Sequence, residues 1–427
     1  MRKELRLKDL GRWRSGGTPP RERREMWEGS LPWLSAKDIN RDELHEPTVF
    51  LTEAAAAAHS RVVPAGSVLL IVRGMSLVHG LPVVLADRRV AFNQDLRALE
   101  VDRRLDPRFV YYALRGHRHK LDAHIDRAAH GTARVVESIY GERIPLFARG
   151  DQVAITDFLD RECERISELL AEVATARAAA VQAHHEQAYT RLLTTDGPLS
   201  RLKDLTGPID TGTWGSDPGE DETDVTCLRV TDFDRPNLNT RPSGAVRSIR
   251  DGQLRRLSLR SGDLLLEKSG GGPSTPVGFV VRYCGSSERQ GICSNFIGRI
   301  RPGPSTDSNY LAHLFAALYH HGVSRPFVKQ VTGIQNLDVR AYLSLRVPAR
   351  DKPTQARLAD LEEAQLTRAL SLRDEYGRLR DELIEYRDAL ITEAVTGKLD
   401  VSRLSDQQFD ESLHAVAEGS PPEVLSA

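Results

Sequence analysis

The chain has 427 residues, 40% of them hydrophobic, and its 59 basic and 60 acidic side chains give a formal net charge of −1. This length favours two or more domains. No apolar run approaches the roughly 18 residues of a membrane span, which excludes an integral membrane protein, and no apolar segment follows the basic start, so we expect no secretory signal. The four cysteines form no CxxC pair, which argues against a disulfide framework or structural zinc site and predicts a reducing compartment, the cytoplasm.

The charge is unevenly placed along the chain. Residues 1–24 carry nine Lys/Arg against three acidic residues, which predicts a basic patch on a chain that is neutral overall. Fifty of the 59 basic residues are arginine, whose planar group suits phosphates and guanine edges, although a GC-rich genome produces the same excess. Charge alone therefore predicts no partner.

An internal repeat dominates the sequence, because three features recur in the same order. They are the identical pentapeptide RLKDL, a glycine-containing turn before a short apolar strand, and an N-capped amphipathic helix. The two copies lie at 6–10 and 201–205, at 64–70 and 260–266, and at 106–114 and 307–315. A repeat of this kind predicts two domains of the same fold.

A long helix is predicted after each copy. Gln152 and Gln355 occupy matching places near the two helix starts, and apolar residues then follow a heptad spacing, from Leu159 to Val173 and from Leu372 to Leu390. Helices of about 40–45 residues would each be roughly 60–70 Å long. We favour packing of the two seams on each other over a stripe that binds a partner.

The predicted fold class is α+β: two recognition domains in tandem repeat, separated by two long helices packed as an antiparallel coiled coil. Short apolar runs such as 68–72 and 277–281 predict the strands. The predicted organisation is a first domain at 1–148, a first helix at 149–195, a second domain at 196–350, a second helix at 351–400, and a disordered tail at 401–427.

Common catalytic motifs are missing. The sequence has no phosphate-binding loop, no dinucleotide fingerprint, no amino-methyltransferase tetrapeptide and no zinc-protease motif. His117, His119, His124 and His130 cluster among basic residues, but their spacing favours a solvated or phosphate-facing helix over a metal site. The glycine run 270–272 is more typical of a flexible loop than of an anion nest.

Several motifs resemble one family, the specificity (S) subunits of type I restriction-modification systems. The segment Gly16-Gly17-Thr18-Pro19, with the tryptophans and the Asp38-Ile39 pair that follow, is similar to the start of that family's target-recognition domains. Its counterpart in the second half is the segment 228–233, which lacks the GGTP element, and the segments 332–337 and 345–348 resemble the family's exit from that domain. Residues 386–401, YRDALITEAVTGKLDV, are the most specific match. The resemblance covers about residues 5–401.

The resemblance implies a non-catalytic subunit that recognises double-stranded DNA. Such a subunit holds two methyltransferase (M) subunits, which use S-adenosylmethionine, and two endonuclease/translocase (R) subunits in systems that restrict DNA. Two alternatives stay open. One is a coiled-coil scaffold that joins two protein-binding domains without touching nucleic acid, and the other is an enzyme with an unrecognised site.

On this reading each domain reads one half of a bipartite target, and the helices set the spacing between the halves. Each candidate residue has a plainer alternative role in surface solubility or turn capping. The candidates for phosphate contacts are Arg12, Arg14, Arg21, Arg23 and Arg24. The candidates for base readout are Lys37, Arg73, Asn93, Gln94 and Arg134 in the first domain and Arg229, Lys268, Asn295, Lys329, Gln335 and Asn336 in the second.

Overall fold

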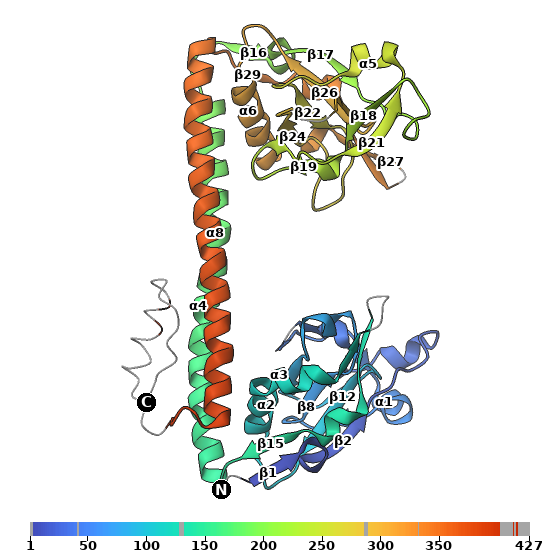
Figure 1. Ribbon diagram of the computed structural model, residues 1–427, viewed down its shortest axis with the longest axis vertical. Coiled ribbons are helices and arrows are strands. Elements are labelled where there is room, and N and C mark those ends of the chain that lie inside the picture. Colours follow the sequence, from blue (N-terminus) through green and yellow to red (C-terminus); the bar gives the residue numbers. More distant parts are fainter. Residues whose placement is uncertain are drawn as a thin grey trace. The chain divides into compact units, whose positions relative to one another are not determined.

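The computed structural model describes residues 3–40, 42–127, 132–285, 289–331 and 333–401, together with Leu413 and Val416. Its internal contacts divide the chain inside each long helix. Unit 1 comprises Met1–Val173 with Arg378–Ala427, and unit 2 comprises Ala174–Gly377 (Figure 1). The predicted domain ranges remain predictions, and the predicted tail lies outside the described residues except for Val401, Leu413 and Val416.

In the described residues, unit 1 is built on two four-stranded sheets, two smaller sheets and a two-stranded hairpin. The main sheet is antiparallel, in the order β10 (Val83–Leu85), β8 (Val68–Ile71), β12 (Leu96–Val101) and β2 (Gly11–Ser15). The second has the order β6 (Phe50–Leu51), β3 (Leu31–Leu34), β11 (Val90–Phe92) and β7 (Val62–Val63), with β3 and β11 parallel. The smaller sheets are β13 (Ile125–Arg127), β14 (Ala133–Val135) and β9 (Arg73–Gly74), and β1 (Lys3–Arg6) with β15 (Arg143–Leu146).

Short helices and a hairpin complete unit 1. Helix α2 packs on β10 and β8 and buries Phe109, Val110 and Leu114 on its apolar face. This packing covers strand β8, which is buried at all four positions. The remaining elements are α1 (Glu53–His59), α2 (Pro107–Gly116), α3 (Arg118–Leu121), and the hairpin of β4 (Ile39–Asn40) with β5 (Glu43–Leu44).

Unit 2 repeats this plan. The main sheet has the order β17 (Thr206–Thr211), β26 (Ile297–Pro302), β22 (Leu264–Glu267), β24 (Val280–Arg282), β20 (Asn239–Thr240) and β19 (Phe233–Asp234). The other sheets are β21 (Ala245–Ile249), β18 (Thr223–Leu228) and β25 (Gly291–Cys293); β23 (Ser269–Gly270), β28 (Ile334–Leu337) and β27 (Val328–Val331); and β16 (Leu199–Arg201) with β29 (Arg346–Pro348). The short helices are α5 (Asp251–Leu257), α6 (Ser308–His320) and α7 (Val339–Tyr342).

Corresponding backbone hydrogen bonds show that the two units share one frame. The Gly17 N–H donates to Phe92 O at 2.9 Å, and the Thr213 N–H donates to Cys293 O at 2.8 Å. Each bond fixes the end of one strand, β2 or β17, against the sheet that contains the parallel strands, β3 with β11 or β18 with β25. The predicted α+β class and its duplication are confirmed.

The two long helices are α4 (Arg149–Leu193) and α8 (Lys352–Thr396), each of 45 residues. Within unit 2, Arg191 of α4 pairs with Glu362 of α8 at 2.6 Å, and Arg177 lies beside Gly377. The residue numbers at these contacts decrease along α4 as they increase along α8. The two helices therefore run antiparallel, as predicted from the two seams.

A glutamine near the start of each long helix joins it to the neighbouring short helix. The Asp106 N–H donates to Gln152 Oε1 at 2.9 Å, and the Asp307 N–H donates to Gln355 Oε1 at 2.8 Å. Both glutamines are only 2% exposed. Each aspartate also caps its short helix, by accepting from a backbone N–H two residues on.

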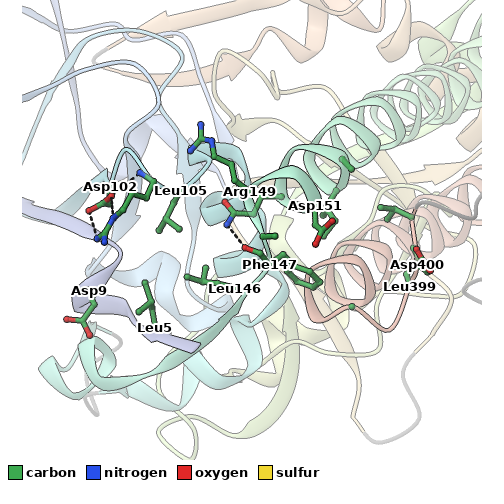
Figure 2. A pocket seen from close by; sticks show the side chains of 17 residues that line it. Leu5, Asp9, Asp102, Leu105, Leu146, Phe147, Arg149, Asp151, Leu399 and Asp400 are labelled. Atoms are coloured by element: carbon green, nitrogen blue, oxygen red, sulfur yellow. Dashed lines mark hydrogen bonds and ion pairs between the residues drawn. The ribbon is translucent and has the colours of Figure 1, made fainter. Parts of the chain in front are cut away.

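In unit 1 this junction borders a cavity of about 930 Å3. Figure 2 shows Asp102, Leu105 and Phe147 on one part of its wall and Leu399 and Asp400 on another. The dashed line to Phe147 is the bond that the Gln152 amide donates to its carbonyl at 2.9 Å.

Within the described residues, no helix has both the length and the apolar character that a membrane crossing requires.

Candidate nucleic-acid interface

Four segments of unit 1 meet at a surface that we call edge 1: the 3-10 helix Ala36–Asp38, the turn 93–96, β9 and β14. The Asn93 N–H donates to Leu34 O at 2.9 Å, and the Val72 N–H donates to Asp95 O at 2.8 Å. Strand β9 then pairs with β14. Edge 1 thereby gathers four of the predicted base-reading residues, all exposed: Lys37, Arg73, Gln94 and Arg134.

Two of these side chains already have partners. Arg134 forms an ion pair with Asp126 at 3.1 Å, and Gln94 Oε1 accepts from the Thr18 hydroxyl at 2.7 Å. Both interactions are on the surface, where exchange for a nucleic-acid partner costs little. The Gln94 amide nitrogen is the group that could donate to a base edge without loss of the Thr18 bond.

The other two candidates of this region face inward. Asn93 is 7% exposed, and its amide donates to Asp95 at 2.9 Å inside the turn. Arg14 forms an ion pair with Glu100 at 2.6 Å across strands β2 and β12. These contacts give both residues a role in holding the frame, and their predicted DNA contacts remain predictions.

Unit 2 has an equivalent surface, which we call edge 2: the 3-10 helix Val230–Asp232, the turn 294–297, β23 and β28. The Ser294 N–H donates to Leu228 O at 2.9 Å, and the Lys268 N–H donates to Phe296 O at 3.0 Å, so both bonds of edge 1 recur. Around this edge lie the predicted residues Arg229, Lys268, Asn295, Lys329 and Asn336.

The cations of edge 2 are paired with carboxylates. Arg229 contacts Asp232 at 3.0 Å, and the hydrogen bond that it donates to this carboxylate raises the pKa of the guanidinium. Lys329 contacts Asp338 at 2.7 Å and lowers the pKa of that carboxyl. The Arg229 and Lys329 side chains are both exposed, so these cations can turn toward phosphate or base acceptors.

The two amides of β28 are placed differently. Gln335 is 7% exposed and accepts from the Val277 N–H at 3.3 Å, which assigns it to the frame. Asn336 is exposed and accepts from the Ser269 hydroxyl across the β23–β28 pair. Its free amide hydrogens make it the stronger of the two candidates for base readout.

A cavity of about 680 Å3 opens at edge 2, and two of its residues were missed by sequence reasoning. Phe296 and Trp214, 43% and 39% exposed, line it beside Arg229 and Asn295. Aromatic side chains of this kind usually lie in a core, so no sequence pattern distinguished them. The equivalence of the turns 93–96 and 294–297 is the signal that could have found Phe296, because it places this residue at the position of half-buried Asp95, next to exposed Gln94.

An acidic group beneath this cavity is neutralised by its neighbour. Glu267 is 2% exposed, and burial raises the pKa of its carboxyl, while Arg235 opposes that shift from 2.5 Å away. The pair therefore adds little negative charge to the edge.

The predicted phosphate-binding residues lie on the start of unit 1. Arg12 is exposed on β2, and the rest occupy an exposed segment after the Gly-Gly-Thr-Pro motif: Arg21, Arg23 and Arg24. This arrangement agrees with a basic patch.

The histidine cluster is divided among structural contacts. The ring of His117 hydrogen-bonds Ala113 O at 2.8 Å, and burial lowers its pKa. His124 lies between Ser138 and Glu142, at 2.7 and 2.9 Å, and His130 lies outside the described residues. Across the part of the chain that the structure describes, no three metal-ligating side chains come together.

Comparison with known proteins gives one match in sequence. No family model matches the chain. The specificity subunit of the Escherichia coli type I restriction enzyme EcoR124I/EcoR124II is 32% identical over 162 residues, which cover 36% of this chain and 39% of that subunit. The chain thus matches well under half of its relative's length.

Solved structures extend the similarity in fold. A chain from a structural study of complex assembly and conformational transition in the type I restriction-modification system superposes with a TM-score of 0.67 at 16% identity, over 93% of this chain and 98% of that one. The HsdS subunit of Thermoanaerobacter tengcongensis gives a TM-score of 0.48 at 16% identity, over 93% and 97%.

The chain therefore shares its fold with a chain from a type I restriction-modification system. The match in sequence is to a specificity subunit, so the resemblance first seen in the motifs is confirmed.

Proposed function

We propose that this chain is the non-catalytic subunit that gives a type I restriction-modification complex its DNA sequence specificity. Each unit would read one half of a bipartite target, and the two long helices would set the spacing. The observation that carries the proposal is that one backbone frame occurs twice with different side chains on its exposed edge.

The differences between the edges have the character of base recognition. Gln94 of edge 1 corresponds to Asn295 of edge 2, and Arg134 corresponds to Asn336, because each pair holds the same place in the hydrogen-bonded frame. Arginine suits guanine, and asparagine and glutamine suit adenine. Two edges that differ in this way fit two half-sites of different sequence.

Linking two weak readers in one chain increases both affinity and discrimination. Once one unit is bound, binding of the other becomes intramolecular, and each correct base pair adds to the same complex. The exposed arginines of the basic patch would position unit 1 on phosphates without reading sequence.

The proposed partners follow from the same assignment. They are double-stranded DNA, two methyltransferase subunits that carry S-adenosylmethionine, and two endonuclease/translocase subunits where the system restricts DNA. A net charge of −1 is compatible with DNA binding if the partner subunits neutralise much of the phosphate backbone. The scaffold alternative is not favoured, because the sequence match is to a specificity subunit, and an unrecognised enzyme site is disfavoured for the same reason.

The test is genome-wide mapping of adenine methylation by long-read sequencing. The chain is expressed with its neighbouring methyltransferase and, separately, each is expressed alone. A split motif that requires both proteins supports the proposal. A stable complex of the two that methylates no motif and binds no duplex at low salt would favour the scaffold.

Single variants then assign the contacts. Arg12→Ala should reduce the salt dependence of binding for every sequence, because it removes one phosphate contact. Asn336→Ala should instead relax the preference at one base pair of one half-site. Arg88→Ala, a surface arginine paired with Asp87 and Glu46, is the matched control and should change neither property.

A further inference from the structure

The cavity at edge 2 is apolar on a surface that is otherwise polar. Its wall is formed by the rings of Trp214 and Phe296, by Val230 and by the glycines of β23 and its neighbour, Gly270 and Gly271. Exposed aromatic rings around a hollow of about 680 Å3 are costly in water unless they meet an apolar group on binding.

The backbone of Phe296 and the ring of Trp214 are held in place before any ligand binds. Phe296 lies in the turn 294–297, and its carbonyl accepts from the N–H groups of Lys268 and Ser269 at 3.0 and 3.2 Å. The Arg247 guanidinium stacks 5.0 Å from the Trp214 ring and donates to Gly215 O at 3.3 Å. A contact made by these rings would therefore cost little conformational entropy.

Unit 1 lacks this feature at the same place in its frame. Asp95 corresponds to Phe296, because the carbonyl of each accepts a hydrogen bond from the residue that directly follows β8 or β22. Thr18 corresponds to Trp214, since each follows the residue that donates to the end of β11 or β25. These two positions are thus aromatic in edge 2 and polar in edge 1, as expected for residues that distinguish one half-site from the other.

Only one base presents an apolar group in the major groove, namely thymine through its 5-methyl. We propose that the cavity walled by Phe296 and Trp214 is the binding site for a thymine methyl group in the half-site read by unit 2. The proposal rests on the proposed function. Asn295 and Arg229 at the cavity rim would contact the polar edges of the same or the adjacent base pair.

The test uses the full-length chain, co-purified with its methyltransferase, and duplexes that contain the mapped target. Each thymine is replaced in turn by deoxyuridine, which lacks only the methyl. We expect one replacement in the unit 2 half-site to weaken binding about fourfold, the value of one buried methyl group. In Phe296→Ala the same replacement should have no effect, because the variant no longer contacts the methyl.

Phe50→Ala is the matched control, because Phe50 is also phenylalanine, is 37% exposed and lies in β6 of unit 1. It should keep the full penalty for deoxyuridine. Trp214→Leu, which retains an apolar wall of smaller area, should give an intermediate penalty.

Three results would overturn the proposal. The first is a unit 2 half-site without thymine. The second is a deoxyuridine scan that leaves wild-type binding unchanged across that half-site. The third is a Phe296→Ala variant that binds thymine and deoxyuridine duplexes more weakly by the same factor, so that the deoxyuridine penalty persists. The last result would mean that the ring stacks on a base. Failure of the proposed function looks different, because the wild-type complex would then bind target and random duplexes alike.

Discussion

Replacing Gln355 with methionine should loosen helix α6 without affecting unit 1. The change removes the bond accepted from the Asp307 N–H and the bond donated to Arg350 O, both at 2.8 Å, while methionine keeps the side-chain volume. A buried backbone donor left unsatisfied costs about 1–3 kcal/mol. We therefore expect a loss of about 2 kcal/mol in the local stability of α6, which corresponds to about 30-fold faster amide exchange.

Hydrogen–deuterium exchange of peptides from α6 and α2 measures this loss. Gln152→Met is the reciprocal variant, because Gln152 makes the equivalent bonds to the Asp106 N–H and Phe147 O at 2.9 Å each. It should accelerate exchange in α2 and leave α6 unchanged. Less than threefold acceleration in a variant's own helix, or equal acceleration in both helices, would refute the assignment of these glutamines as equivalent anchors.

Three further predictions concern stability. Acid should destabilise unit 2, because burial lowers the pKa of His185 to about 3 and that of His320 to about 4. The stability that both neutral rings contribute above pH 6.5 is then lost as the pH falls toward 4. His185→Phe, which can keep the 3.5 Å ring stack, should flatten the pH dependence of the urea midpoint. Gly212→Ala should reduce the yield and melting temperature sharply, since a Cβ would lie 2.0 Å from Cys293 O, whereas Gly272→Ala, with no atom within 4 Å, should not. Glu362→Gln should lower the free energy of unfolding of unit 2 by about 2 kcal/mol in urea titration, a value reduced by the 27% exposure of Arg191, and exposed Glu375→Gln should be neutral.

The fold could be predicted because its signals are periodic or repeated. The heptad seams and the duplicated order of turn, strand and capped helix are local patterns, and the structure follows them. The edges could be predicted only in part. Asn93 and Gln335 have the side-chain chemistry of base readers, but both are buried and form hydrogen bonds within their own unit. Phe296 and Trp214 could not be found, because the sequence does not report which aromatic rings the fold leaves exposed.

The contacts that define the two edges explain why one backbone frame can carry different exposed side chains. The bonds that tie the turns 93–96 and 294–297 to the neighbouring strands join backbone atoms, so Asp95 and Phe296 can occupy equivalent places without loss of these bonds. At two further places of the frame the units carry the same residue: glutamine at 152 and 355, and glycine at 16 and 212, where a Cβ would lie within 2.2 Å of a carbonyl oxygen. On the proposed function, changes at exposed positions of either edge should therefore alter the target sequence while both units stay folded.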